Sequence, residues 1–261
     1  MKIHGTAKGG AISKKDFGVA FGGGAVEPIN DENLAAYYKF NETSGNILNS
    51  SESDESVGSA AAFEVTGASY NVGESPLGYA MTFDGTNDVI KVATSKSIFN
   101  FMHNTSAVFT VCLWLKITSG SDKFILVDDE NGTGFKLGSN SSGNLRFYTY
   151  NGTSDEVAGT LSDNDAFPDT TNYYFYVLTY DESLASDNAN LYRNASLIHT
   201  QSKTGDAADN SNSANTMQMG KQPGVGNYTA MGVSELSIWN KILSSDEIDA
   251  LYNSGNGRAI Y

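Results

Sequence analysis

Adjacent acidic residues are the first candidates for chemistry in this sequence. Two carboxylates that face one cleft can act as nucleophile and general acid in the hydrolysis of a glycosidic bond. Neighbours in a strand point to opposite faces, however, and the chain contains no Glu-x-Asp-x-x-Glu string. We therefore interpret these acids as solvated turn residues, apart from the last pair, which belongs to a helix cap, and predict no catalytic residue. They lie at Asp54-Glu55, Asp128-Asp129-Glu130, Asp155-Glu156 and Asp246-Glu247.

Tyrosines with nearby amides form a second candidate group, suited to binding sugars. Tyr148 and Tyr150 are two residues apart, so they share one face of a strand. Aromatic faces stack on sugar rings and amides bind sugar hydroxyls. The alternative is that paired tyrosines simply cover a sheet. The predicted carbohydrate-binding set is Tyr148, Tyr150, Asn151 and Tyr228.

A third group could bind a metal ion. Asp84, Asn87 and Asp88 supply hard oxygen ligands close together in one loop, and calcium prefers such ligands. The alternative is a tight hairpin in which these side chains accept hydrogen bonds from their own backbone. No cofactor is required by these patterns, and calcium is the ion that they could accept.

The other common catalytic patterns are missing from the sequence. No Gly-x-Ser-x-Gly string occurs, and His4, His103 and His199 have no companion ligands at metal-binding spacing. Residues 224–226 begin a glycine-rich string, but Thr229 stands where a phosphate-binding loop needs glycine. The sequence therefore gives no positive indication of an enzyme.

These candidate groups lie in or between short apolar runs that predict an all-β fold. The runs are separated by Gly, Asn, Asp and Ser, which favour turns. Residues 108–116 and 173–180 are apolar on both alternating faces, which predicts central strands covered on both sides. The predicted strands are residues 35–40, 60–65, 79–83, 89–92, 108–116, 124–127, 145–150, 173–180, 190–193 and 236–239.

The C-terminal part of the chain predicts a last strand followed by one short helix. Residues 232–238 alternate as in a strand, whereas the apolar residues between 248 and 252 recur at helical spacing. Ser244 and Glu247 have the spacing of a capping box, and Gly255 can adopt the left-handed conformation that ends a helix. This reading assigns the acidic pair that ends at Glu247 to the helix cap.

Composition separates a basic N-terminal arm from an acidic body. The net charge is −14, but the first 24 residues carry four lysines and one aspartate, a charge of +3, which leaves −17 for the rest. This acidity argues against nucleic acid as a partner, and no apolar run approaches the length of a membrane span.

The single cysteine, Cys112, lies in an apolar run, which predicts an inert buried thiol. We also predict core positions for Trp114 and Trp239.

Residues 1–27 are rich in glycine with scattered lysines and single apolar residues, so they cannot form a core of their own. We predict an extended arm that docks on a partner, in front of one domain at residues 28–261, and the alternative is a flexible leader. The predicted docking residues are Lys2, Ile3, Lys8, Lys14, Lys15, Phe17 and Phe21.

Five blocks in order resemble those of laminin-G-like, concanavalin A-like jelly rolls. The resemblance implies a sandwich of two antiparallel sheets, here with one short C-terminal helix and an extended N-terminal arm. Relatives often carry calcium, but Asn49 stands where they commonly have Asp, which removes a charge from the expected site. The leader resembles those on structural proteins of marine bacteriophages. The blocks lie at residues 34–45, 78–88, 109–116, 174–181 with 191–194, and 235–244.

Together these features predict a non-enzymatic protein of a virion surface, a capsid decoration or fibre component attached through its arm. Its expected partners are capsid or other virion proteins and cell-surface glycans, and self-association is compatible with the sequence. The alternative is a free, extracellular carbohydrate-binding lectin or adhesion module. A glycoside hydrolase is the third hypothesis, because glycanases also adopt this fold.

Overall fold

The computed structural model describes residues 32–51, 61–92, 96–119, 123–130, 133–140, 144–150, 167–207, 216–224 and 226–260. The predicted docking arm and Asn151 lie outside these residues.

The described residues form fourteen strands, one short α-helix and two 3-10 turns. The helix is preceded by all of the strands, as the sequence predicts. In chain order the elements are β1 (Leu34–Tyr38), β2 (Phe63–Thr66), β3 (Ser69–Val72), β4 (Tyr79–Asp84), β5 (Val89–Val92), η1 (Lys96–Met102), β6 (Val108–Ser119), β7 (Phe124–Glu130), β8 (Thr133–Ser139), β9 (Leu145–Thr149), β10 (Tyr174–Asp181), β11 (Ala189–Arg193), β12 (Ser196–Gln201), β13 (Gln218–Met219), β14 (Ala230–Trp239), α2 (Ser245–Tyr252) and η2 (Asn253–Gly255).

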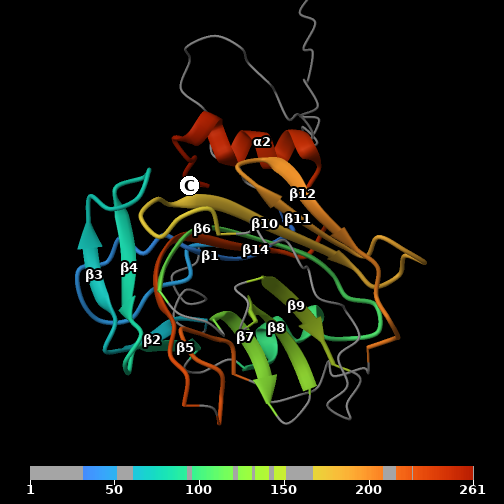
Figure 1. The fold of residues 1–261 in the computed structure, drawn as a ribbon, viewed down its shortest axis with the longest axis horizontal. Coiled ribbons are helices and arrows are strands. Elements are labelled where there is room, and N and C mark those ends of the chain that lie inside the picture. The colour runs from blue at the N-terminus through green and yellow to red at the C-terminus, as the bar shows by residue number, and fades with distance from the viewer. Residues whose placement is uncertain are drawn as a thin grey trace, which may run out of the picture.

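The strands make two antiparallel sheets that pack as layers (Figure 1). The eight-stranded sheet has the order β12-β11-β10-β6-β14-β4-β3, with β1 also paired to β14. The six-stranded sheet has the order β2-β5-β13-β7-β8-β9. The predicted sandwich of two antiparallel sheets is confirmed, and β6 and β10 are interior strands, as their two-sided apolar pattern predicts.

The main core lies between the two sheets. Alternate residues of β6, such as Val111 and Leu113, point into it and meet Phe135 and Phe147 from the smaller sheet. Aromatic rings interlock there: the ring of Phe109 lies 6.1 Å from that of Phe135, between centroids. Burial of this apolar surface is the main force that holds the sheets together.

A second core lies between the outer face of the eight-stranded sheet and α2, which crosses that face (Figure 1). Cys112, Trp114 and Trp239 are buried here, which confirms the burial that the sequence predicts for them. Ile248 and Leu251 are the helix residues that cover them. The sandwich is thus a three-layer structure at this point, because the helix covers this part of the sheet.

The helix begins with the predicted capping box. The Glu247 amide donates to Ser244 Oγ (3.3 Å), and the Ser244 amide donates to the Glu247 carboxylate (2.8 Å). The helix ends earlier than Gly255, because Asn253 already adopts the left-handed conformation (φ 49°). Gly255 (φ 92°) then ends the short 3-10 turn that follows. An Asn can take this position since its short polar side chain tolerates the left-handed region.

Strand β14 departs from the strict alternation that the sequence predicts. Val233 and Leu236 both face the core between the sheets, although they are three residues apart. The pairing register with β6 shifts between Ser234 and Ser237, and Glu235 lies there at φ 52°. This β-bulge adds one residue and turns Glu235 away from the main core. It also stores backbone strain, because a non-glycine residue rarely adopts positive φ.

Candidate functional site

The predicted sugar-binding tyrosines lie on the outer face of the six-stranded sheet. In β8, Phe135 and Leu137 point into the core, so the residue between them, Lys136, points outward. Lys136 pairs with Tyr148 of β9, whose neighbour Phe147 again belongs to the core. The shared strand face that the sequence predicts for the tyrosines is therefore the outer one.

Two cationic side chains cover the rings on this face. Lys136 Nζ lies 5.2 Å from the ring centroid of Tyr148, 5.9 Å from that of Tyr150 and 5.7 Å from that of Phe124. The guanidinium carbon of Arg146 lies 4.3 Å from the Tyr148 centroid. These distances suit cation–π attraction, which holds the charged groups over the rings.

Both tyrosine side chains are buried, whereas stacking on a sugar requires an exposed ring face. Tyr148 is 2% exposed and Tyr150 is 7% exposed. The Tyr148 hydroxyl is buried and has no hydrogen-bond partner among the described residues. Asn151 lies outside the described part of the chain. Direct stacking on Tyr148 or Tyr150 remains a prediction that would require one of these rings to be uncovered.

Tyr228 is the partly exposed aromatic residue of the predicted set. Strand β13 pairs with β7 and so brings the following segment to the same sheet. There Lys221 Nζ donates to the Tyr228 hydroxyl (3.2 Å) and lies 4.8 Å from its ring centroid. Lys136 Nζ donates to Gln222 Oε1 (3.3 Å), which joins the two groups. We call this set the tyrosine–lysine face: Lys136, Arg146, Tyr148, Tyr150, Lys221, Gln222 and Tyr228.

The predicted metal ligands form the hairpin turn between β4 and β5. Asp88 is buried and accepts the Asp84 amide (2.7 Å), while Asp84 accepts the Thr86 amide (2.7 Å). Burial raises the pKa of Asp88, and the Asp84 amide opposes that rise. Asn87 is exposed. The carboxylates thus stabilise the turn as the alternative reading expects, and among the described residues no group of three or more His, Cys, Asp or Glu could hold a metal. Calcium at this turn remains a prediction.

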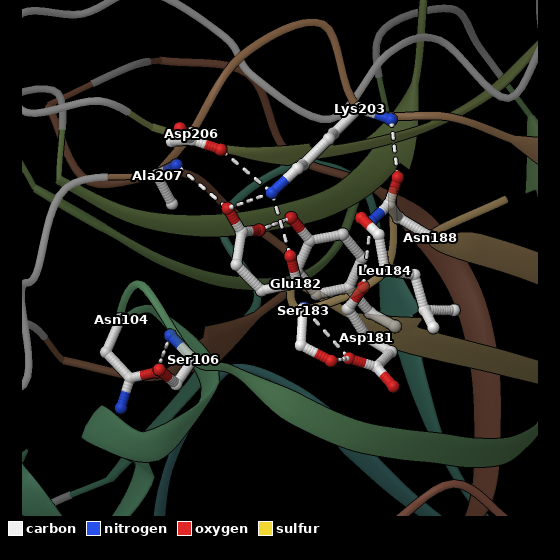
Figure 2. Close-up of polar contacts among 11 residues, drawn as sticks. Asn104, Ser106, Asp181, Glu182, Ser183, Leu184, Asn188, Lys203, Asp206 and Ala207 are labelled. Atoms are coloured by element: carbon white, nitrogen blue, oxygen red, sulfur yellow. Dashed lines mark hydrogen bonds and ion pairs between the residues drawn. The ribbon is translucent and has the colours of Figure 1, made fainter. Parts of the chain in front are cut away.

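A cluster of ion pairs that no local sequence pattern predicts surrounds the buried carboxylate of Glu182 (Figure 2). The Glu182 side chain follows β10 and is 1% exposed. Lys203 Nζ contacts the Glu182 carbonyl (2.8 Å), the Glu182 carboxylate (3.3 Å) and the Asp206 carboxylate (2.8 Å). The Ala207 amide and the Tyr180 hydroxyl also donate to Glu182. Burial raises the pKa of Glu182 despite these donors. The cluster ties the β10–β11 turn to the segment that follows β12.

Glu235 is a second buried carboxylate that the sequence did not reveal. Its side chain lies under the C-terminal segment and accepts a hydrogen bond from the Tyr37 hydroxyl, which in turn accepts the Ile260 amide (3.2 Å). Burial raises the pKa of Glu235 to about 7. The adjoining cavity, also lined by Cys112 and Arg258, has room for roughly one water molecule. Burial also raises the pKa of the Cys112 thiol, which fits its predicted inertness.

One histidine has a partner that lies far from it in the sequence. His103 Nε2 and Asp128 Oδ2 are 3.2 Å apart, and both side chains are buried in the core. The sequence predicts a solvated turn for the acidic run at residues 128–130, which is wrong for Asp128, because that residue is buried in β7.

The arrangement of two sheets and a capping helix agrees with a family model. The model of the concanavalin A-like lectin/glucanases superfamily matches residues 84–249, which is more than half of the chain. The chain belongs to this superfamily. The match includes both central strands and the whole tyrosine–lysine face of this concanavalin A-like chain. A comparison with curated proteins finds no match.

Solved structures with the same fold include botulinum neurotoxin binding domains. The serotype D binding domain has 16% identity and a TM-score of 0.59, over 85% of this chain and 51% of that one. The serotype DC domain in complex with SialylT has 18% identity and a TM-score of 0.59, over 87% of this chain and 52% of that one. The same domain in complex with rat synaptotagmin II has 18% identity and a TM-score of 0.57, over 85% of this chain and 52% of that one. The concanavalin A-like chain spans about half the length of these domains. At such identities the likeness shows the fold alone.

Proposed function

We propose that this protein is a non-catalytic, glycan-binding adhesion module whose ligand site is the tyrosine–lysine face. The observation that carries the proposal is the contact of Lys221 with both the hydroxyl and the ring of Tyr228, on a partly exposed surface beside Lys136. A half-buried tyrosine offers one ring face to the apolar side of a sugar. The lysines and Gln222 offer donors and an acceptor for sugar hydroxyls.

The family and the structural neighbours support a binding role. The superfamily includes lectins beside glucanases, one neighbour is a toxin binding domain in complex with SialylT, and another is a toxin binding domain in complex with rat synaptotagmin II. A glycan site on a β-sandwich also agrees with the general placement of binding residues on a rigid scaffold. These likenesses favour adhesion without identifying the sugar.

The carboxylates of the described residues favour binding over hydrolysis. Retaining and inverting glycosidases need two carboxyl groups on opposite sides of one bond. The most buried glutamates, Glu182 and Glu235, lie after β10 and in β14, and each accepts a tyrosine hydroxyl. Glu235 is the only carboxylate among the residues that line the cavity beside it. We therefore propose a module that holds a glycan and does not cleave it.

We further propose that the module is displayed on a virion surface through its N-terminal arm. The supporting observation is the charge difference within the chain, +3 for the first 24 residues against −17 for the rest. A basic strap can dock on a partner with an acidic patch while the acidic body faces away from it. Replacing Lys2, Lys8, Lys14 and Lys15 by Gln should abolish co-sedimentation with particles. Unchanged co-sedimentation would contradict docking through these lysines.

A glycan array probed with the full-length protein tests the binding role. Tyr228→Ala should reduce binding to the best ligand about five- to thirtyfold, because stacking on one aromatic ring contributes about 1–2 kcal/mol. Tyr79→Ala is the matched control, since Tyr79 is 39% exposed and lies on the other sheet. Equal losses in both variants, or binding that neither variant changes, would place the site elsewhere.

A further inference from the structure

The tyrosine–lysine face is built from two stretches of chain that contain no acidic residue. Residues 133–150 contain Lys136 and Arg146, and residues 216–234 contain Lys221, without any Asp or Glu. The whole chain has 30 acidic residues and a net charge of −14. The two stretches meet through the hydrogen bond from Lys136 Nζ to Gln222 Oε1. The tyrosine–lysine face thus contains three basic residues and no acidic one, in a protein of net negative charge.

The charged group of Lys221 is held in position by an aromatic residue and not by an acid. An ammonium carries three donors, and one of them goes to the Tyr228 hydroxyl at 3.2 Å. Among the described residues no carboxylate lies within ion-pair distance of Lys221. Its side chain is partly exposed, as is that of Tyr228. The remaining donors can therefore bind an anionic group that arrives beside the Tyr228 ring.

We propose that this face selects acidic saccharides, which carry a carboxylate or a sulfate, over neutral ones, and that Lys221 is the main contact for the acidic group. This inference rests on the proposed function, because it specifies the ligand of the same site. The sugar ring packs on Tyr228 while its acidic group accepts donors from Lys221. Charge-assisted hydrogen bonds are about twice as strong as neutral ones, which gives the selectivity.

The charge of the whole chain favours a short acidic saccharide over a nucleic acid. A positive patch attracts an anion over about 8 Å at physiological ionic strength. A long polyanion extends beyond this distance and is repelled by the net negative charge of the rest of the protein. A single acidic sugar stays inside the patch. The face is thus suited to an isolated acidic group on a sugar chain.

Matched pairs of saccharides test this selectivity on the full-length protein by isothermal titration calorimetry. The first pair is galacturonate oligomers and their methyl-esterified form, in which a methyl group removes the carboxylate charge. The second is a sulfated galactan oligomer and its desulfated form. We expect the charged member of at least one pair to bind about tenfold tighter. The pair that responds distinguishes carboxylate from sulfate.

Two lysine variants connect the selectivity to the site. Lys221→Gln should bring the charged-to-neutral affinity ratio close to one. Lys91→Gln should keep the ratio, because Lys91 lies on the same sheet but pairs with Glu64 at 3.6 Å. If both variants lower the ratio equally, the preference comes from non-specific charge and the inference fails.

The remaining outcomes separate the two proposals. Equal binding of charged and neutral members would overturn the inference and leave the glycan-binding function standing. Binding of neither member of either pair, together with a negative glycan array, would overturn both. Tight binding of DNA oligomers under the same salt conditions, stronger than any saccharide, would also contradict the inference.

Discussion

The buried Glu235 carboxyl makes the stability of this protein depend on pH in a direction opposite to that of most carboxylates. Its pKa is raised to about 7 by burial, whereas an ordinary glutamate in an unfolded chain titrates near 4.5. A raised pKa means that the folded state favours the protonated form. The protonated Glu235 side chain therefore makes its full contribution to the stability of the folded state below about pH 4.5, and this contribution is lost as the pH rises through about 7.

The size of this effect follows from the two pKa values. Each pKa unit corresponds to about 1.4 kcal/mol, so ionised Glu235 lowers the free energy of unfolding by about 3 kcal/mol at pH 8, relative to a neutral side chain. The substitution Glu235→Gln keeps the size and the acceptor oxygen for the Tyr37 hydroxyl but cannot ionise. We expect equal stability of the two proteins at pH 4.5 and an advantage of about 3 kcal/mol for the variant at pH 8.

Urea denaturation at half-unit steps from pH 4.5 to 8 measures this difference. Tryptophan fluorescence is a suitable signal, because Trp114 and Trp239 are both buried beside the helix. Glu64→Gln is the control, since that side chain is 47% exposed and should change little. Parallel pH profiles for wild type and Glu235→Gln would mean that ionisation of Glu235 does not destabilise the folded state. So would a variant that is less stable than wild type at pH 8.

Two further variants test the other structural assignments by the same denaturation assay. Lys203→Met should lower the free energy of unfolding by about 3 kcal/mol at pH 7, because Glu182 keeps its burial but loses its ammonium, and adding Glu182→Gln should restore most of the loss. An undiminished stability would mean that the ion pair contributes little. Gly138→Ala should cost about 1–3 kcal/mol, because its Cβ would lie 2.1 Å from the Lys123 carbonyl oxygen. Gly226→Ala, which meets no atom within 4 Å, should be nearly neutral, and equal effects of the two glycine variants would contradict the packing of β8.

The fold could be predicted from local patterns because they are strong in the central elements. Two-sided apolar runs identify β6 and β10, and the spacing of Ser244 and Glu247 identifies the start of the helix. Strands β3, β8, β12 and β13 were not predicted. Strand β8 contains two glycines and β13 has only two residues, so neither has a period long enough to recognise.

The candidate site could be predicted only in part, because its key contacts join distant residues. The common strand face of Tyr148 and Tyr150 follows from their spacing, but their burial depends on the rest of the fold. The contact between Lys221 and Tyr228 could have been predicted from the sequence, since the two residues lie only seven apart across a glycine-rich turn. The partnership of Tyr37 with Glu235 spans 198 residues, and a bulge creates it. No local pattern contains that information.

A crystal structure of the full-length protein with an acidic oligosaccharide would show whether the tyrosine–lysine face binds the ligand. Soaks at several concentrations would separate specific occupancy from binding at crystal concentration only. We predict a sugar ring against Tyr228, with its acidic group within hydrogen-bond distance of Lys221 Nζ. A saccharide bound on the eight-stranded sheet or at the Glu182 cluster, with an empty tyrosine–lysine face, would contradict the account.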